Sequence, residues 1–303
     1  MGFSSSKLRH LFTKNSVTTC VDTDWNPPKP LLDLLYITGQ EHDSTLESIV
    51  KATQSKKKGW LRSGERWHKQ EERFSMDVRM KIRQLAIELG YLEEILPKKK
   101  EYSRVVVFGA SAEAVKDRFE FAVKLFNEGI QTKKLVFLGS TRSLDEPAAD
   151  ARYKEEMLGT EYEADEAGLM QYLFENKVDA PEEMKALEIL TIRAERANGR
   201  RANTADTLEE WLREDKDLLM DAEAEGEELS VLTISNQPYC KYQGKVAEIF
   251  LTGYSKLDNW SHECVGPGTS MATATELSTN QTARILDSIA RDLYSKLKLK
   301  QAV

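Results

Sequence analysis

The stretches Arg104-Val-Val-Val-Phe-Gly-Ala-Ser111 and Lys134-Leu-Val-Phe-Leu-Gly-Ser140 decide the fold of this 303-residue chain. Each is a compact apolar run that stops at a glycine followed by a small hydroxyl residue, and an amphipathic segment lies between them. A strand, a helix and a second strand in this order predict a βαβ unit with two parallel strands. The strand tips of such a unit are expected to open into a polar crevice.

Five strands are expected along the chain, and segments of helix length separate them. They span 104–108, 134–138, 188–193, 230–234 and 261–265. Between the first two, four apolar residues fall on one helical stripe: Val115, Phe119, Ala122 and Phe126. Strands that alternate with helices form a parallel sheet with right-handed crossovers. The sequence therefore predicts the α/β class, as a three-layer Rossmann-like parallel sheet of about five strands with an N-terminal helical extension.

Three regions are expected from the change of composition along the chain. Residues 1–30 are rich in Ser and Thr and end in Asn26-Pro27-Pro28-Lys29-Pro30, which favours a flexible, extended arm. Residues 31–100 are expected to form a helical lead-in. One helical face there carries five apolar residues before Gly90 closes the helix: Phe74, Val78, Ile82, Leu85 and Leu89. Residues 101–303 are expected to form the α/β domain, with a last helix built on Ile285, Ile289 and Leu293.

Composition predicts a globular protein without a membrane span. No apolar run approaches the roughly 20 residues that cross a bilayer, and the N-terminus lacks an apolar core of signal-peptide length. The three cysteines are an odd number and lie far apart, as expected for thiols in a reducing compartment. We therefore expect a cytoplasmic protein with no transmembrane segment.

Charge is distributed unevenly along the chain. Residues 1–100 carry 18 Lys and Arg against 13 Asp and Glu, whereas residues 101–303 carry 25 against 37. The triplets Lys56-Lys57-Lys58 and Lys98-Lys99-Lys100 favour contact with anions, although such runs are usually solvated loop ends. A nucleic-acid interface needs a continuous basic face with stacking aromatics, and the acidic second half argues against one.

Polar turns follow all five expected strands. They begin at Gly109, Gly139, Arg193, Ser235 and Gly266. Because parallel strands end at the same edge of a sheet, these turns are expected to line one ligand-binding crevice. The spacing G-x-G-x-x-G of a dinucleotide site and the G-K-[ST] of a P-loop are absent, so neither standard motif defines the ligand.

Two of these turns carry groups suited to an anion. Ser111 can cap the following helix, whose N-terminus would favour negative charge. The third turn holds four arginines before Asn203-Thr204 opens a helix: Arg193, Arg196, Arg200 and Arg201. Guanidinium groups beside a helix N-terminus make a clamp for phosphate or carboxylate, and a solvated basic loop with an ordinary cap is an equal alternative.

An ordered series of motifs runs through residues 104–300. In chain order it consists of Arg118-x-x-x-Ala122, Gly139-Ser140, Glu166-Ala167 with Met170, Glu195, Asn203-Thr204 and Ser235. This order resembles the YdcF/SanA-like family of largely uncharacterised proteins. The family's histidine after the fourth strand and the second glycine of its S-G-G motif have no counterpart in this chain.

The resemblance implies a Rossmann-like fold with a pocket at the strand tips, and S-adenosylmethionine as a ligand. It implies catalytic or anchoring roles for Glu166 and Glu195. The expected ligand-binding residues are Gly109, Ser111, Gly139, Ser140, Arg193, Asn203, Thr204 and Ser235. Carboxylates of the acidic stretch, Glu166 and Glu195 among them, also suit Mg²⁺ with a phosphorylated ligand, although most of an acidic run is normally a solvated face.

The resulting hypothesis is an α/β protein that binds a small anionic or nucleotide-like molecule at its strand tips, with hydrolase or transferase chemistry as an extension. A thiol nucleophile at Cys240 with His262 as its base is a weaker hypothesis, because no spacing places the two side chains within reach. The alternative from another class is a non-catalytic adaptor that contacts a protein partner through residues 31–100.

Overall fold

The computed structural model describes residues 26–62, 64, 68–145, 147–195, 201–215, 218, 229–254 and 260–302. The expected arm therefore lies outside the described residues up to position 25. Contacts divide the chain into two compact units. The helical unit contains Met1–Glu94, Gln237–Lys245 and Gly268–Val303, and the α/β unit contains Ile95–Asn236 and Val246–Pro267.

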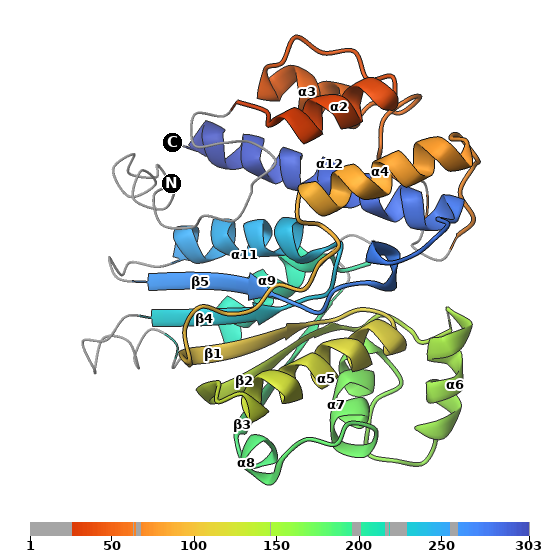
Figure 1. The fold of residues 1–303 in the computed structure, drawn as a ribbon. Helices are drawn as coiled ribbons and strands as arrows, with labels where there is room; N and C mark the ends of the chain where they lie inside the picture. The colour runs from red at the N-terminus through yellow and green to blue at the C-terminus, as the bar shows by residue number, and fades with distance from the viewer. Residues whose placement is uncertain are drawn as a thin grey trace. The chain divides into compact units, whose positions relative to one another are not determined.

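The α/β unit is built on a five-stranded sheet, and its strands are those expected from the sequence. They are β1 (Glu101–Phe108), β2 (Gln131–Ser140), β3 (Glu188–Ala194), β4 (Leu229–Ile234) and β5 (Trp260–Val265). All neighbouring strands are parallel, in the order β3-β2-β1-β4-β5 (Figure 1). The expected fold class is confirmed. The chain reverses its direction of travel across the sheet between β1 and β4.

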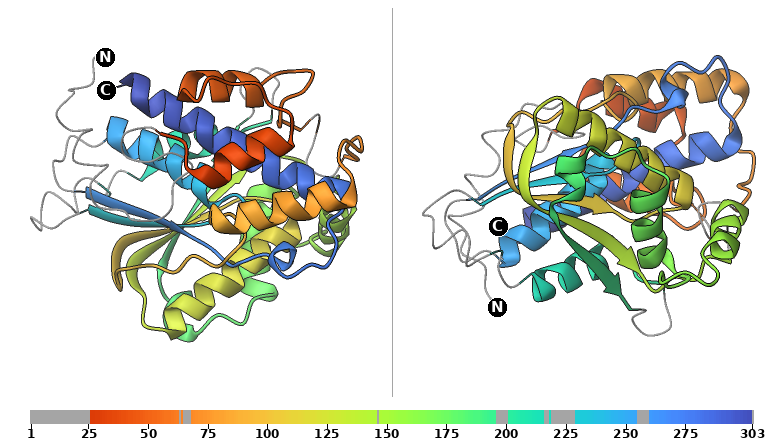
Figure 2. Two further views of the ribbon diagram at one scale, coloured as in Figure 1. Left: turned by 45° about the horizontal axis from the view of Figure 1, so that its top comes forward. Right: turned by 90° about the horizontal axis from the view of Figure 1, so that it is seen from below.

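Helices cover both faces of this sheet, which gives three layers (Figure 2). One face packs on α5 (Ala112–Asn127), α6 (Ala148–Glu156), α7 (Glu166–Asn176) and α8 (Glu182–Lys185). The other packs on α9 (Thr204–Glu214) and the later part of α11 (Cys240–Tyr254). The two layers follow from the strands themselves, whose near-continuous apolar runs bury side chains on both faces.

An aromatic cluster stabilises the layer that contains α5 and α7. Phe119 of α5, Phe137 of β2 and Phe174 of α7 have ring centroids 4.8 to 5.3 Å apart in edge or tilted contacts. Aromatic pairs in such geometry contribute about 0.5–1.5 kcal/mol each beyond the area they bury. The cluster fixes α5 and α7 against β2, and the first residues of both helices lie at the carboxyl edge of the sheet.

A buried ion pair stabilises the opposite, amino end of the sheet. Arg104 of β1 and Asp215, which follows α9, are both fully buried and form two hydrogen bonds of 2.9 and 3.2 Å. Trp211 donates to the same carboxylate at 3.0 Å, and Lys134 lies 3.5 Å from it. Burial opposes the charged form of Asp215, but these partners outweigh burial and lower its pKa. The pair holds the end of α9 on the sheet.

The helical unit has its own apolar core. It contains α2 (Lys29–Ile37), α3 (Leu46–Thr53), α4 (Met76–Glu88), the short helix η2 (Ser270–Ala272) and α12 (Thr279–Ala302). Buried leucines of α2 pack with Ile49 of α3, Ile82 of α4 and Ile289 of α12. Gly90 follows α4 with φ +70°, which confirms it as the residue that ends this helix.

Two boundaries differ from those expected. The last helix, α12, belongs to the helical unit and not to the α/β unit. Its buried residues Ile285, Ile289 and Leu293 lie in the same apolar core as residues of α2, α3 and α4. The arm was expected to reach residue 30, but α2 begins at Lys29. Its first turn tolerates Pro30 because the first amides of a helix have no partner within it. In the part of the chain that the structure describes, no helix is long and apolar enough to cross a membrane.

Candidate functional site at the carboxyl edge of the sheet

Glycines at two strand tips bring the backbone of the α/β unit close together. A Cβ on Gly139 would lie 2.5 Å from the Cα of Ala167, so only glycine lets the end of β2 meet the first turn of α7. A Cβ on Gly109 would lie 2.5 Å from the carbonyl oxygen of Leu138 and 3.2 Å from the carboxyl carbon of Glu166. The two glycines that define the sequence pattern therefore admit Glu166 to the edge of the sheet.

Glu166 is a buried carboxylate at the centre of this edge, 4% exposed. The hydroxyl of Ser140 donates to its Oε2 at 2.5 Å. Its Oε1 lies 3.6 Å from Nε of Arg142 and 3.5 Å from Nη2 of Arg201. The structure brings together Gly109, Gly139, Ser140 and Glu166, four of the residues expected at the site.

Arg142 links Glu166 to a second buried carboxylate, that of Asp150 in α6. Arg142 Nη2 donates to Asp150 at 2.7 Å and to the carbonyl of Ala110 at 3.2 Å. The other oxygen of Asp150 accepts from the amide of Ala112 at 2.7 Å, in the first turn of α5. Burial raises the pKa of Asp150, although the Ala112 amide and Arg142 act in the opposite direction.

Ser111 was expected to cap α5 beside an anionic ligand, but the carboxylate of Asp150 lies at this helix end instead. Ser111 occupies the N-cap position of α5, but its side chain makes no capping hydrogen bond. A protein carboxylate already lies at this helix end and offsets its positive dipole. An anionic ligand is therefore not expected at the start of α5.

Arg118 lies where the strand order reverses. It is fully buried on α5, and its guanidinium donates to the carbonyl oxygens of Phe108 and Gly109 at 2.7 and 2.9 Å. It also donates to Oδ1 of Asn236, just after β4, at 2.7 and 3.0 Å. Arg118 thus joins the tips of β1 and β4. Ser235, expected as a ligand residue, is fully buried beside Asn236.

Arg193 and Asp165 form a half-buried ion pair at the tips of β3 and α7. Asp165 also caps α7, since its Oδ1 accepts from the amide of Gly168 at 2.9 Å. Burial raises the pKa of Asp165, against the effect of the Gly168 amide and the Arg193 charge. The expected ligand residue Arg193 is thus engaged with the protein's own carboxylate.

Asn203 and Thr204 open α9 through a complete capping box. The Asn203 side chain accepts from the amide of Ala205 at 2.8 Å, and Asp206 accepts from the amide of Asn203 at 2.8 Å. These groups complete the helix end, which accounts for Asn203 without a ligand. Of the four arginines expected in this turn, Arg196 and Arg200 lie outside the described residues, whereas Arg201 contacts Glu166.

Glu195 does not join Glu166 in an acid/base pair. Glu195 is exposed after β3, and it adds a small effect to that of Glu210 in raising the pKa of Arg213 on α9. The weaker thiol hypothesis also finds no support. Cys240 is fully buried, and His262 lies within β5, opposite Val231, with Nε2 2.9 Å from the hydroxyl of Thr233.

Three residues of the site were missed at the sequence level as site residues: Arg118, Arg142 and Asp150. A signal existed for Arg118, because it shares the helical face of Val115, Phe119 and Ala122, and an arginine on an apolar stripe indicates a buried cation. No sequence signal indicated Asp150, since an acidic stretch is normally a solvated face.

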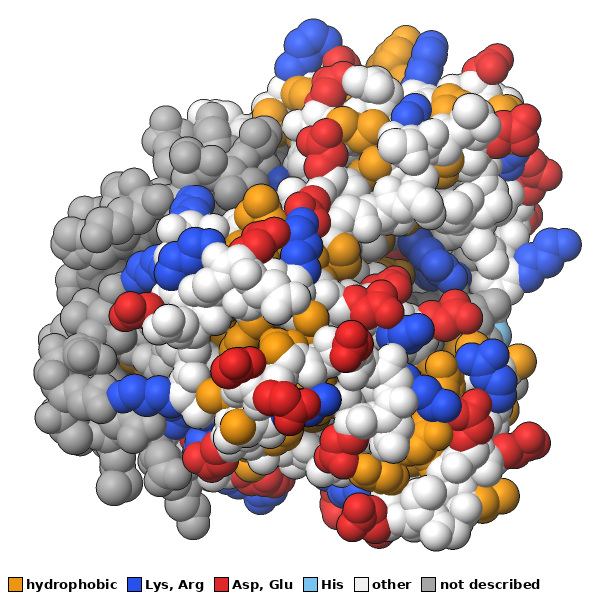
Figure 3. Space-filling model, turned by 60° about the horizontal axis from the view of Figure 1, so that its bottom comes forward, with side chains coloured by type: hydrophobic (Ala, Val, Ile, Leu, Met, Phe, Trp, Pro, Cys, Tyr) orange, Lys and Arg blue, Asp and Glu red, His pale blue; other side chains and the backbone are white. Residues whose placement is uncertain are grey.

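Charge on the surface of the molecule is mixed. On the face shown in Figure 3, Asp and Glu side chains lie among Lys and Arg side chains over the described residues. Among the residues that the structure places, no three His, Cys, Asp or Glu side chains gather as a metal site. Comparison with protein-family models, with curated proteins and with solved structures found no match.

Proposed function

We propose that the α/β unit binds a small nucleotide-like molecule at the carboxyl edge of its sheet, between the tips of β1, β2 and β3. The observation that carries the proposal is the pairing of Glu166, a buried carboxylate, with Arg201, a guanidinium whose side chain is 30% exposed. Open α/β sheets bind ligands at this edge.

The carboxylate of Glu166 and the guanidinium of Arg201 together favour a ligand with both hydroxyl and anionic groups. In dinucleotide sites a carboxylate at a strand end accepts from ribose hydroxyls, and Glu166, at the start of α7 beside Gly109, would make the same interaction. Arginine suits phosphate or carboxylate because its donors match those oxygens in pairs. Arg201 would hold the anionic part of the ligand and Glu166 its hydroxyl part. S-adenosylmethionine, which carries a ribose and a carboxylate, fits the same description.

We expect side chains, rather than helix N-termini, to contact the anionic group of the ligand. Asp150, Asp165 and Asn203 already occupy the N-termini of α5, α7 and α9. A ligand that relied on a helix dipole would have to displace one of these groups. Hydrolase or transferase chemistry at this edge would use Glu166, whose carboxylate is held by Ser140 and flanked by Arg142.

A thermal-shift screen tests the proposal with adenosine, adenine nucleotides, S-adenosylmethionine and sugar phosphates. We expect the nucleotide-like compounds to raise the melting temperature more than adenosine or sugar phosphates alone, because they engage both Glu166 and Arg201. No stabilisation by any compound would refute the proposal.

A further inference from the structure

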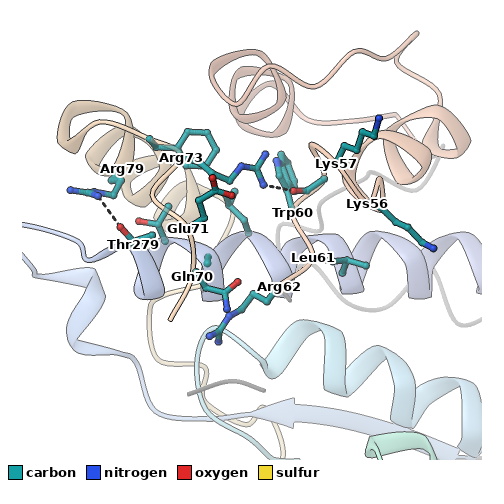
Figure 4. Close-up of a pocket in the computed structure, with 15 residues that line it drawn as sticks. Lys56, Lys57, Trp60, Leu61, Arg62, Gln70, Glu71, Arg73, Arg79 and Thr279 are labelled. Carbon is teal, nitrogen blue, oxygen red and sulfur yellow. Dashed lines mark hydrogen bonds between the residues drawn. The ribbon is translucent and has the colours of Figure 1, made fainter. Parts of the chain in front are cut away.

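A basic pocket lies within the helical unit. It is a cavity of about 170 Å³ whose walls carry five cationic side chains and one carboxylate, Glu71. The cations are Lys56, Lys57, Arg62, Arg73 and Arg79. Figure 4 shows that they come from different segments: Lys56 and Lys57 follow α3, Arg73 precedes α4 and Arg79 lies on α4.

The guanidinium of Arg73 in this pocket is hydrogen-bonded to backbone carbonyl groups. Its two terminal nitrogens donate to the carbonyl oxygens of Gly59 and Lys58, each at 2.7 Å, and its guanidinium lies 5.5 Å from the ring of Phe74. Among the described residues, no carboxylate forms an ion pair with it. Carbonyl oxygens orient a guanidinium without cancelling its charge, so the pocket keeps a net positive field.

Lys56 and Lys57 add to this field. Both are exposed, and neither has an ion-pair partner in the described part of the chain. Arg79 is held between Glu72, at 2.7 Å, and the hydroxyl of Thr279, at 3.1 Å. Like charges gathered in this way repel one another, and a multivalent anion relieves the repulsion.

We propose that this pocket binds a compact molecule with several phosphate groups, separately from the ligand of the α/β unit. The cavity is several times the roughly 30 Å³ of one water molecule, which suits a headgroup rather than a polymer. Trp60 is buried and its Nε1 contacts the hydroxyl of Thr38, so it offers no face for stacking a base. The chemistry therefore favours clustered phosphates over nucleic acid.

Calorimetric titration with inorganic tripolyphosphate tests this proposal on the full chain. The Lys56→Gln/Lys57→Gln variant should bind about tenfold more weakly, from two exposed charge interactions of under 1 kcal/mol each. Lys51→Gln/Lys81→Gln removes the same charge from two other exposed lysines of the helical unit and should bind as the unchanged chain does. Equal weakening in both variants, or no binding by the unchanged chain, would overturn the pocket assignment.

Two further titrations identify the source of the phosphate groups. Vesicles that contain phosphatidylinositol bisphosphate, compared with phosphatidylcholine alone, test a lipid headgroup. Tripolyphosphate binding without vesicle binding supports a free ligand, and vesicle binding that the Lys56→Gln/Lys57→Gln variant loses supports a headgroup. A single-stranded oligonucleotide that binds more tightly than tripolyphosphate at the same salt concentration would contradict a compact ligand.

Discussion

Ser140 at the tip of β2 donates its hydroxyl proton to the buried carboxylate of Glu166 at the start of α7, at 2.5 Å. The same hydroxyl oxygen accepts from the amide of Arg142 at 3.3 Å. One serine thus orients both the carboxylate and the loop that carries its arginine. Because Gly139 allows this approach, the glycine–serine pair of the sequence acts as the support of the site.

The Ser140→Ala variant should lose about 1–3 kcal/mol of unfolding free energy, because buried Glu166 and Arg142 lose a hydrogen-bond partner. Urea unfolding followed by circular dichroism measures the loss. Ser143→Ala in the same loop is the control, since the Ser143 hydroxyl bonds only the exposed Asp145 among the described residues and its loss should cost under about 0.5 kcal/mol. Equal losses in the two variants would show that Ser140 does not support the buried network.

The Gly139→Ala variant should be destabilised by about 1–3 kcal/mol, because its Cβ would overlap the backbone of Ala167. Gly129→Ala is a matched control: nothing lies within 4 Å of its Cβ, but its φ of +92° is strained for alanine. Hydrogen exchange distinguishes the two variants. Only Gly139→Ala should speed exchange in the first turn of α7, and unchanged exchange there would contradict the close approach.

Asn203 is interpreted as a helix cap rather than a ligand contact. Asn203→Ala should cost about 1 kcal/mol of stability, whereas Asn203→Asp should retain it because aspartate caps equally well. Both variants should bind the ligand of the α/β unit as the unchanged chain does. If Asn203→Ala loses ligand binding without losing stability, Asn203 contacts the ligand and is not merely a helix cap.

Asp215 should make the α/β unit sensitive to acid. The pKa of a free aspartate is about 3.9, and Arg104 lowers that of Asp215 in the folded state despite burial. The stability that the charged form contributes is therefore fully present above about pH 4 and is lost as the pH falls through the lower, folded pKa.

Asp215→Asn should cost about 3–5 kcal/mol at pH 7, because it leaves Arg104 buried without its carboxylate partner. The difference from the unchanged chain should shrink near pH 3, because the unfolded chain then binds a proton at Asp215 more readily than the folded chain does. Urea unfolding at the two pH values measures this change. The exposed Asp179→Asn variant should follow the unchanged chain at both, and a pH-independent cost of Asp215→Asn would contradict the assignment.

The sheet could be predicted from the sequence because its signals are local. Apolar runs near Val106, Val136 and Val231 are long enough for buried strands, and the residues between them have helical periodicity. Gly90 ends its helix as expected, with a positive φ, and Gly129 follows α5 with a positive φ as well. The partner of α12 could not be predicted, because its apolar stripe suits either a sheet or a helix bundle.

The site could be predicted only in part. Gly109, Gly139 and Ser140 meet because the tips of parallel strands share an edge of the sheet, whereas Glu166 was expected only from the family resemblance. The pairings of Asp150 with Arg142 and of Asp165 with Arg193 depend on how α6 and α7 return to that edge. Long-range contacts of this kind leave no periodic signal in the chain.

The adaptor alternative needs a test other than truncation. Removing the first 97 residues would expose Ile285, Ile289 and Leu293, which share a core with α2 and α4. Exposed charge variants such as Lys51→Gln/Lys81→Gln keep that core and can be used in partner capture instead.

Calorimetric titration of adenosine diphosphate and of S-adenosylmethionine tests the central claim most directly. At least one should bind the unchanged chain, and Arg201→Gln should weaken that binding about tenfold through the loss of a charged hydrogen-bond donor. Lys116→Gln, on the exposed face of α5, should leave it unchanged. Binding of equal strength in Arg201→Gln, or no binding of either compound, would contradict a nucleotide-like ligand at the carboxyl edge.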